Sequence, residues 1–249
     1  SQHLVTRPVF DALFPGYEFT DHNPVARVMQ AMLTALEGSN LESETEALAE
    51  FYESVRLRAA GIDNAEGKQR VITELYEKFF RLAFPRSADA LGIVYTPTEI
   101  VDFILRSVND LLVTEFGTRI SAPGVHVLDP FTGTGTSITR LLASGLISPE
   151  DLARKFTSEL HANEITLLAY YIAAANIEAT FHDLTASFAA DAVAPASADP
   201  RAWVPFDGIV LADTFQMSEH EDVLDGLVFR TNSERAERQL DLDIRVIVG

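Results

Sequence analysis

Cysteine is absent from the 249 residues, and basic side chains are few. Without cysteine there can be no disulfide and no thiolate metal site, so any chemistry must depend on oxygen and nitrogen groups or on a bound ligand. The 19 Lys and Arg residues against 37 Asp and Glu give a formal net charge of −18. Proteins that bind nucleic acid tightly without a partner are usually basic, because phosphate contacts dominate the affinity. We therefore expect weak or no binding of double-stranded DNA by this acidic chain alone.

Long hydrophobic runs are also missing. No apolar run approaches the roughly 18 residues that a membrane span needs. The first residues, SQHLVTRPVF, lack the basic head and apolar core of a secretory signal. We expect no membrane segment and a cytoplasmic location. The composition, with 47% hydrophobic and 22% charged residues, is ordinary for a globular protein with one large or two small domains.

Helical patterns fill the first part of the chain. Asn23 is a predicted N-cap with Pro24 at the first helical position, where its missing N–H costs nothing. Apolar residues at helical spacing predict two more helices, over residues 41–61 and 66–84. Residues 1–90 are therefore predicted to form an α-helical N-terminal domain.

A further helix is predicted over residues 95–112, YTPTEIVDFILRSVNDLL. Thr96 and Glu99 match the spacing of a capping box, and Pro97 lies between them in the first turn. Five apolar residues are expected to face the core: Ile100, Phe103, Ile104, Leu111 and Leu112.

Beyond residue 120, short apolar runs alternate with helical stretches. Strands are predicted over 125–129, 158–165, 208–213 and 244–249, and helices over 137–146 and 166–181. This alternation predicts an α/β fold with a parallel sheet and helices on both faces. The charged stretch 218–243 is predicted to be a surface insertion.

The stretch VHVLDPFTGTGT contains the most informative turn. Asp129 ends the first strand, Gly133 and Gly135 follow it, and Glu164 ends the next strand. Glycines let a backbone approach a ligand closely, and ligands of such sheets bind beyond the carboxyl ends of the strands. A dinucleotide fingerprint needs a third glycine where Ile138 stands, and a phosphate-binding Gly-Lys-Ser/Thr is absent. An acid such as Glu164 can accept hydrogen bonds from ribose hydroxyls, and Asp129 can order an ammonium group. These features favour an adenosine ligand with a cationic amino-acid arm.

Four short motifs carry a family resemblance. YTP at 95–97, DPFTGTG at 129–135, NEI at 163–165 and ADTF at 212–215 resemble, in order, the motifs of gamma-class S-adenosylmethionine-dependent DNA adenine-N6 methyltransferases. Longer stretches, including TRPVFDALF and GIVYTPTEIVDFILRSV, resemble the methyltransferase region of Type ISP (single-polypeptide) restriction–modification enzymes. The resemblance covers nearly the whole chain. It implies a Rossmann-like methyltransferase fold over 91–249, with an incomplete sheet, after a coupler-like helical domain over 1–90.

The resemblance also implies S-adenosylmethionine as the cofactor and a role for each motif. The first motif would line the methionine end, the second would form the main cradle, the third would hold the ribose and adenine, and the fourth would meet the adenine amino group and ring. Each of these roles has a structural alternative: Asp129 could be a helix cap, Asp213 a turn acid and Phe215 a core aromatic. The implied cofactor-binding residues are Tyr95, Thr96, Pro97, Asp129, Pro130, Phe131, Gly133, Gly135, Glu164, Ile165, Asp213 and Phe215.

The family's catalytic motif, Asn-Pro-Pro-Tyr or -Phe, is absent from the sequence. In the family its Asn and aromatic ring hold a flipped-out adenine. Here the chain reads IRVIVG where that motif is expected to begin. We therefore expect a catalytically silent part of a longer enzyme that contacts DNA through its other domains, with an unpaired sheet edge and an exposed apolar face. No catalytic residue or metal ligand is expected in the chain, and His161 is interpreted as structural.

Three other functions remain open at this point. The chain could be a non-catalytic module that couples a helicase motor to a recognition domain. It could belong to a methyltransferase for RNA or protein, because the target is not encoded in the cofactor half. A nicotinamide-dependent dehydrogenase fits least, since the third glycine and a catalytic dyad are missing.

Overall fold

A computed structural model of the chain describes residues 23–36, 57, 96–191, 204–217 and 229–249. The chain divides into two compact units, one of Ser1–Ile93 with Glu221–Ser233 and the other of Val94–His220 with Glu234–Gly249. The sequence places a boundary after residue 90, close to the first of these divisions. It did not predict that a later segment belongs with the first unit.

In the first unit, helix α3 (Pro24–Leu36) begins as predicted. Oδ1 of Asn23 accepts hydrogen bonds from the backbone N–H groups of Val25, at 3.1 Å, and Ala26, at 3.0 Å. These are free donors of a first helical turn, so the predicted cap is confirmed. The helices predicted over 41–61 and 66–84 lie outside the described residues, apart from Leu57.

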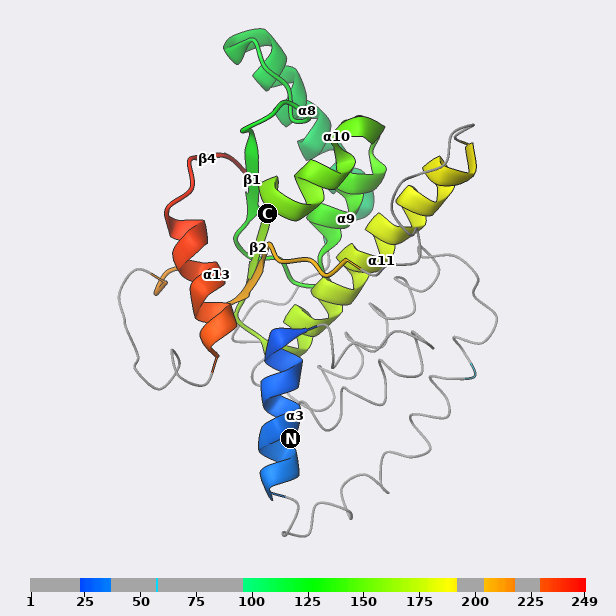
Figure 1. The fold of residues 1–249 in the computed structure, drawn as a ribbon. Coiled ribbons are helices and arrows are strands. Elements are labelled where there is room, and N and C mark those ends of the chain that lie inside the picture. The colour runs from blue at the N-terminus through cyan, green and yellow to red at the C-terminus, as the bar shows by residue number, and fades with distance from the viewer. Residues whose placement is uncertain (1–22, 37–56, 58–95, 192–203, 218–228) are drawn as a thin grey trace. The chain divides into compact units, whose positions relative to one another are not determined.

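The second unit is built on a four-stranded parallel sheet with the order β3-β2-β1-β4 (Figure 1). All four predicted strands form, and the parallel sheet is confirmed. Helices α9 and α11 lie on one side of the sheet and α13 on the other. Strand β4 lies at one edge of this sheet, and the side chain of Ile247 in it is exposed. The elements are α8 (Thr98–Phe116), β1 (His126–Asp129), α9 (Thr136–Ala143), α10 (Pro149–Arg154), the π-helical turn η1 (Lys155–Glu159), β2 (Leu160–Glu164), α11 (Leu167–Asp191), β3 (Ile209–Leu211), α13 (Arg230–Leu240) and β4 (Ile244–Ile247).

The core of this unit lies between the sheet and helix α11. That helix is apolar nearly all round, as expected of a buried helix, and it packs on α9, β2 and β3. The rings of Phe156 and Phe181 stack with their centroids 3.8 Å apart, which joins η1 to α11. Fully or almost fully buried side chains along α11 include Ala169, Tyr170, Tyr171, Ala173, Ala174 and Ile177.

Helix α8 differs from its prediction in two ways. Its buried residues are Val101, Leu105 and Leu112, while three of the residues expected in the core are exposed, Phe103 by 71%. The apolar residues of α8 cover more than one face, and periodicity alone could not tell which face packs. The capping box is also wrong: Pro97 is the N-cap residue, and no side chain caps the helix. The other exposed residues are Ile100 and Leu111.

The charged stretch expected to be a surface insertion contains helix α13. Its residues Arg235 and Gln239 are buried, and Arg235 forms an ion pair with Asp207, just before β3. The insertion prediction is therefore wrong for residues 230–240. A charged side chain could be buried here because its partner comes from a segment distant in sequence.

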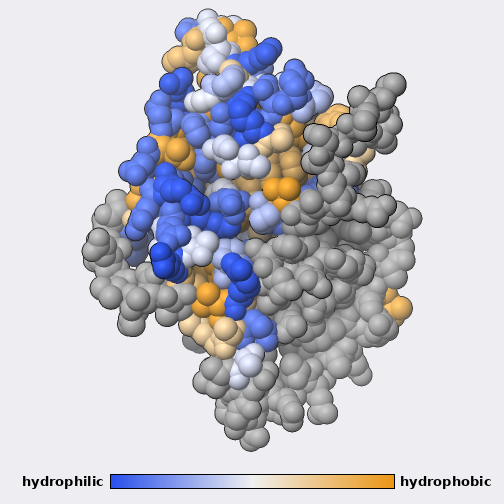
Figure 2. Space-filling model, viewed as in Figure 1, coloured by the Kyte–Doolittle hydropathy of each residue, from blue (hydrophilic) through white to orange (hydrophobic). Residues whose placement is uncertain are grey.

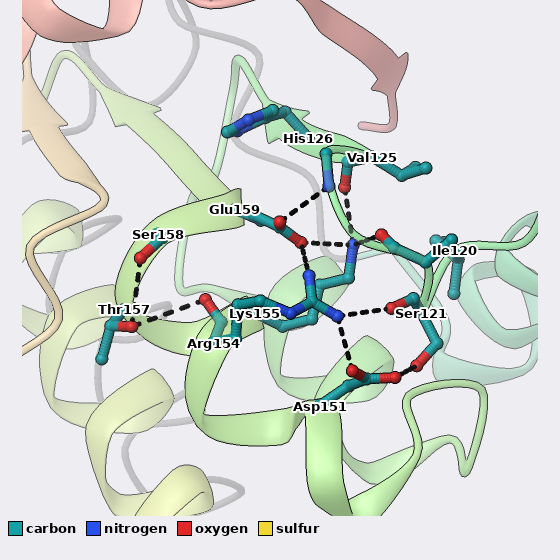
Figure 3. A network of polar contacts seen from close by, with 12 residues as sticks. Ile120, Ser121, Val125, His126, Asp151, Arg154, Lys155, Thr157, Ser158 and Glu159 are labelled. Carbon is teal, nitrogen blue, oxygen red and sulfur yellow. Dashed lines mark hydrogen bonds and ion pairs between the residues drawn. The ribbon is translucent and has the colours of Figure 1, made fainter.

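A polar network fixes the amino end of the sheet (Figure 3). The side chain of Lys155 is fully buried, and its Nζ donates to the carbonyl oxygens of Ala122, at 2.9 Å, and Val125, at 2.7 Å. Nζ also lies 2.8 Å from Oε2 of Glu159. Burial lowers the pKa of Lys155, and the carboxylate of Glu159 opposes that effect. The network holds the segment before β1 against η1, which leads directly into β2.

Candidate ligand site at the carboxyl edge of the sheet

Three loops meet where β1, β2 and β3 end. Thr132 N donates to the carbonyl of Asn163 at 2.9 Å, so the turn after β1 is tied to the end of β2. Thr214 Oγ1 donates to the carbonyl of Pro130 at 2.6 Å, which ties the loop after β3 to the same turn. The meeting follows from topology, because parallel strands end at one edge of the sheet.

Asp129 is the buried acid of the first loop. Its Oδ1 accepts a hydrogen bond from Phe131 N at 3.2 Å. The pKa of Asp129 is raised to about 6, and burial is the main cause. Hydrogen bonds from Ser137 and Phe131 lower this pKa, and the nearby charge of Glu164 contributes to the rise. The carboxylate is therefore held in an environment that opposes its negative charge.

Glu164 is the buried acid of the second loop. Its Oε2 accepts from Gly133 N at 2.9 Å, and its Oε1 accepts from both the N–H and the hydroxyl of Thr166, at 2.8 and 2.6 Å. Burial raises the pKa of Glu164, and the hydrogen bonds from Thr166 and Gly133 oppose the rise. The carboxylate of Glu164 therefore holds the glycine turn in place through its hydrogen bond with Gly133.

The two acids lie on the same face of the sheet. Asp129 is in register with Ala162, and Glu164 follows Ala162 by two residues, which is one period of a strand. Among the described residues, neither carboxylate forms an ion pair with lysine or arginine. Two buried acids without a basic partner favour a positively charged ligand.

The glycines of the turn have different surroundings. Gly135 has φ +87°, and a Cβ there would lie 3.2 Å from the Cα of Ala173 in α11. Asn176 Nδ2 donates to the carbonyl of Thr134 at 2.9 Å, so α11 supports the turn from behind. Gly133 has φ +55°, but a Cβ there would meet nothing within 4 Å. The turn therefore packs on α11 at one glycine and is open at the other.

Apolar side chains surround the site. Phe131 and Phe215 are 58% and 77% exposed, and their ring centroids are 5.4 Å apart. Ile165, directly after Glu164, is also exposed. Large apolar side chains that converge from three loops and remain in contact with water are suited to a flat ring. On the face that Figure 2 shows, the described residues are a mixture of hydrophilic surface and smaller hydrophobic patches.

The other predicted residues are Asp213 and the segment before α8. Asp213 Oδ1 accepts from Phe215 N at 3.0 Å, and its carbonyl accepts from Gln216 N at 3.0 Å, so this acid builds its own turn. Thr96 and Pro97 are exposed at the start of α8, and Tyr95 lies outside the described residues. The residues that the structure brings together are Asp129, Pro130, Phe131, Gly133, Gly135, Glu164, Ile165, Asp213 and Phe215.

Sequence reasoning missed the residues that hold this site in shape. Thr166 and Thr214 each follow a strand-end acid, and a hydroxyl at such a position commonly bonds to nearby backbone or carboxylate groups. That signal was present but was not used. The contacts of Asn176 and of the Asp102–Arg140 ion pair are long-range, and no local pattern predicts them.

The sheet's histidines form a separate pair at its amino end. His126 Nδ1 and His161 Nε2 lie 3.0 Å apart, and the two rings stack. Burial lowers the pKa of His161 to about 4, so the ring is neutral at physiological pH. Within the described residues, no group of three or more His, Asp or Glu side chains could hold a metal ion, and no helix could cross a membrane.

Comparison with known proteins places the first part of the chain in a family. Residues 1–67 match the family model of the coupler domain of Type ISP restriction-modification enzymes. The chain includes a Type ISP coupler domain. No curated protein matches the chain significantly.

Two solved Type ISP enzymes and a third DNA complex are similar to this chain over its whole length. The ATP-dependent enzyme LlaBIII bound to DNA has 49% sequence identity and a TM-score of 0.84, over 99% of this chain and 16% of that chain. A nuclease-deletion mutant of LlaGI, in complex with a DNA substrate mimic, has 47% identity and a TM-score of 0.83, over 100% and 19%. A DrdV–DNA complex has 34% identity and a TM-score of 0.85, over 100% and 23%. The chain thus spans less than a quarter of each of these proteins.

Proposed function

We propose that the chain binds S-adenosylmethionine at the carboxyl edge of its sheet, as the cofactor-binding part of a Type ISP DNA adenine-N6 methyltransferase. One observation carries the proposal. Asp129 and Glu164 are buried on either side of a glycine turn, and neither has a basic partner among the described residues. A ligand that brings positive charge to this turn relieves the cost of burying two carboxylates.

The residues present fit this cofactor. Asp129 would attract the ammonium group of the methionine arm, directly or through water. Thr96 and Pro97, with Tyr95, would line that arm. Glu164 would accept from the ribose, and Phe131, Ile165 and Phe215 would enclose the adenine, with Asp213 at its amino group.

Glu164 has limited capacity for the ribose. A carboxylate offers about four acceptor positions, and Gly133 and Thr166 supply three hydrogen bonds to it. The backbone N–H of Ile165 supplies a further one. A ribose hydroxyl would therefore have to replace one of these bonds, so we expect this segment to rearrange when the ligand binds.

The cofactor supplies an electrophilic methyl group, and the residues of this chain bind and orient it. The sequence contains no Asn-Pro-Pro-aromatic motif to hold a target base, so we expect binding without methyl transfer. DNA as the substrate of the whole enzyme is supported by the DNA-bound relatives. With a net charge of −18, this chain would leave the DNA contacts to other domains.

Calorimetric titration tests the binding site. S-adenosylmethionine should bind the wild-type chain, Asp129→Ala should abolish the binding, and NAD should give no response. Binding that survives Asp129→Ala would place the cofactor elsewhere. Transfer of a radioactive methyl group to DNA by this chain alone would overturn the expectation that it is catalytically silent.

A non-catalytic coupling module is the second candidate, favoured by the coupler match over residues 1–67. It would bind the cofactor without turnover even within a complete polypeptide. An Asn-Pro-Pro-aromatic motif in the full-length protein, with adenine methylation of DNA, would exclude it. Methylation of RNA or protein instead of DNA would show a different target for the same cofactor site.

A further inference from the structure

A bidentate ion pair joins helices α8 and α9. Arg140 Nε donates to Asp102 Oδ1 at 2.8 Å, and Arg140 Nη2 donates to Asp102 Oδ2 at 2.5 Å. Both side chains are 31% exposed, so the pair is partly shielded from water. The hydrogen bond from Arg140 lowers the pKa of Asp102. Two parallel bonds to a planar guanidinium fix orientation as well as distance.

The pair joins the same position in each of two helices that are in contact. Asp102 is the fifth residue of α8, and Arg140 is the fifth residue of α9. Helix α9 begins directly after the glycine turn, at the carboxyl edge of the sheet. Residues 117–125 connect the end of α8 to the start of β1, at the amino edge, so α8 also begins toward the carboxyl edge (Figure 1). The first residues of α8 therefore lie on the ligand side of the sheet.

The hydrogen bonds that hold the remainder of the candidate site do not involve α8. Hydrogen bonds from Thr132, Gly133 and Thr214 hold the loops after β1, β2 and β3 to one another. These loops carry the residues proposed to bind ribose and adenine. Thr96 and Pro97 instead precede α8, whose first turn has no side-chain cap. Their distance from the turn is set by how α8 packs on α9.

We propose that Asp102 and Arg140 act as a positioning pair that sets the start of α8 against the glycine turn, and thereby determines affinity for the amino-acid arm of the ligand rather than for its adenosine part. This inference rests on the proposed function. Neither residue is a catalytic residue, because neither is proposed to touch the ligand. The pair acts through the segment that it places.

The test measures three ligands by calorimetry on the 249-residue chain. S-adenosylmethionine and S-adenosylhomocysteine contain the amino-acid arm, and 5′-deoxy-5′-methylthioadenosine lacks it. Asp102→Asn and Arg140→Gln should each lower the affinity for the first two ligands about tenfold. Each should change the affinity for the third ligand less than about twofold. The two substitutions change the net charge in opposite directions, so a shared loss reports positioning and not a long-range charge effect.

Two further variants complete the design. Asp102→Arg combined with Arg140→Asp restores an ion pair with its charges exchanged, and it should recover most of the lost affinity. Arg245→Gln removes the exposed ion pair between Arg245, in β4, and Asp243, which precedes that strand. This variant should bind all three ligands with unchanged affinity. Circular dichroism at the titration temperature verifies that each variant is folded. If Arg140→Gln unfolds, Asp102→Asn and the exchanged pair still decide the outcome.

The outcomes separate this inference from the proposed function. A wild-type chain that binds none of the three ligands would overturn both. A wild-type chain that binds all three, with variants that lose equal affinity for every ligand or for none, would overturn only the positioning role. The positioning role would be established if affinity is lost only for the two ligands that contain the amino-acid arm and if the exchanged ion pair restores that affinity.

Discussion

The backbone N–H of Gly133 donates a hydrogen bond to Oε2 of Glu164 at 2.9 Å. This bond joins the turn after β1 to the last residue of β2, which is separated from it by α9, α10 and η1. The acid proposed to bind the ribose is therefore also part of what keeps the glycine turn closed. Stability and ligand binding are coupled at this residue, and they can be measured together.

Glu164→Gln should weaken both properties. An amide presents one acceptor and one donor group, so either Gly133 N–H or the Thr166 donors would face an NH₂ group. Leaving a buried donor unsatisfied costs about 1–3 kcal/mol, and affinity for S-adenosylmethionine should fall at least about tenfold. Urea unfolding and calorimetry provide the two measurements. Glu150→Gln, at an exposed position of α10, is the control and should change unfolding by less than about 0.5 kcal/mol.

Asp129→Asn should stabilise the ligand-free chain at neutral pH while it removes ligand binding. The folded pKa of about 6 lies above the ordinary 3.8. Between these values the folded chain binds more protons than the unfolded chain, so this group's contribution to stability is lost as the pH rises from about 4 to about 6. The free energy of unfolding of the wild type should therefore fall by about 2–3 kcal/mol relative to that of Asp129→Asn across that pH window.

Urea unfolding of both chains at pH 4, 5, 6 and 7 measures this difference. Titrating groups that do not interact with Asp129, His161 included, are present in both chains and cancel in the comparison. Glu164 interacts with Asp129, so its titration contributes to the measured difference. A difference in unfolding free energy that stays constant with pH would show that the carboxylate of Asp129 is not held against its charge.

Gly135→Ala and Gly133→Ala form a matched pair. Both positions have positive φ, which costs a non-glycine residue about 1–2 kcal/mol. At Gly135 the added Cβ also approaches backbone atoms of Ala173 to 3.2 and 3.3 Å, so its loss should exceed that at Gly133 by about 1–2 kcal/mol. Thermal or urea unfolding distinguishes them. Equal losses would mean that the contact between the turn and α11 does not constrain the glycine.

Lys155→Met should be strongly destabilising although it is far from the ligand site. The substitution leaves the carbonyls of Ala122 and Val125 without this donor and removes one partner of the buried Glu159. Each buried acceptor left without a donor costs about 1–3 kcal/mol, although Arg154 still pairs with Glu159. Arg245→Met, at an exposed ion pair, should cost less than about 1 kcal/mol. If both substitutions cost the same in urea, the buried network of Figure 3 does not stabilise the amino end of the sheet.

Much of the fold follows from local signals in the sequence. Asn23 caps α3 as its side chain and neighbouring Pro24 predict, because a cap involves only adjacent residues. Both β1 and β2 are short strands that end in an acid, Asp129 and Glu164, and parallel strands bring such ends to one edge. The position of both acids at the same edge of the sheet was therefore predictable from order and spacing.

Other features depended on contacts between distant segments. The apolar residues of α8 cover more than one face, and only packing on α9 decided that Val101 and Leu105 are buried while Phe103 is exposed. Helix α13 was mistaken for a surface insertion because its buried Arg235 has a partner, Asp207, that precedes β3. In each case the decisive energy comes from a residue that no local window contains.

The sequence by itself determined the order of helices and strands and the types of residue at the strand ends, since periodicity, capping and turn chemistry act over a few neighbouring residues. Tertiary structure alone decided which side chains lose contact with water and which polar groups find partners. The pKa of Asp129, the closed turn at Gly133 and the join between Asp102 and Arg140 all result from burial and contact across the fold. Desolvation and long-range hydrogen bonds exist only once the chain has folded.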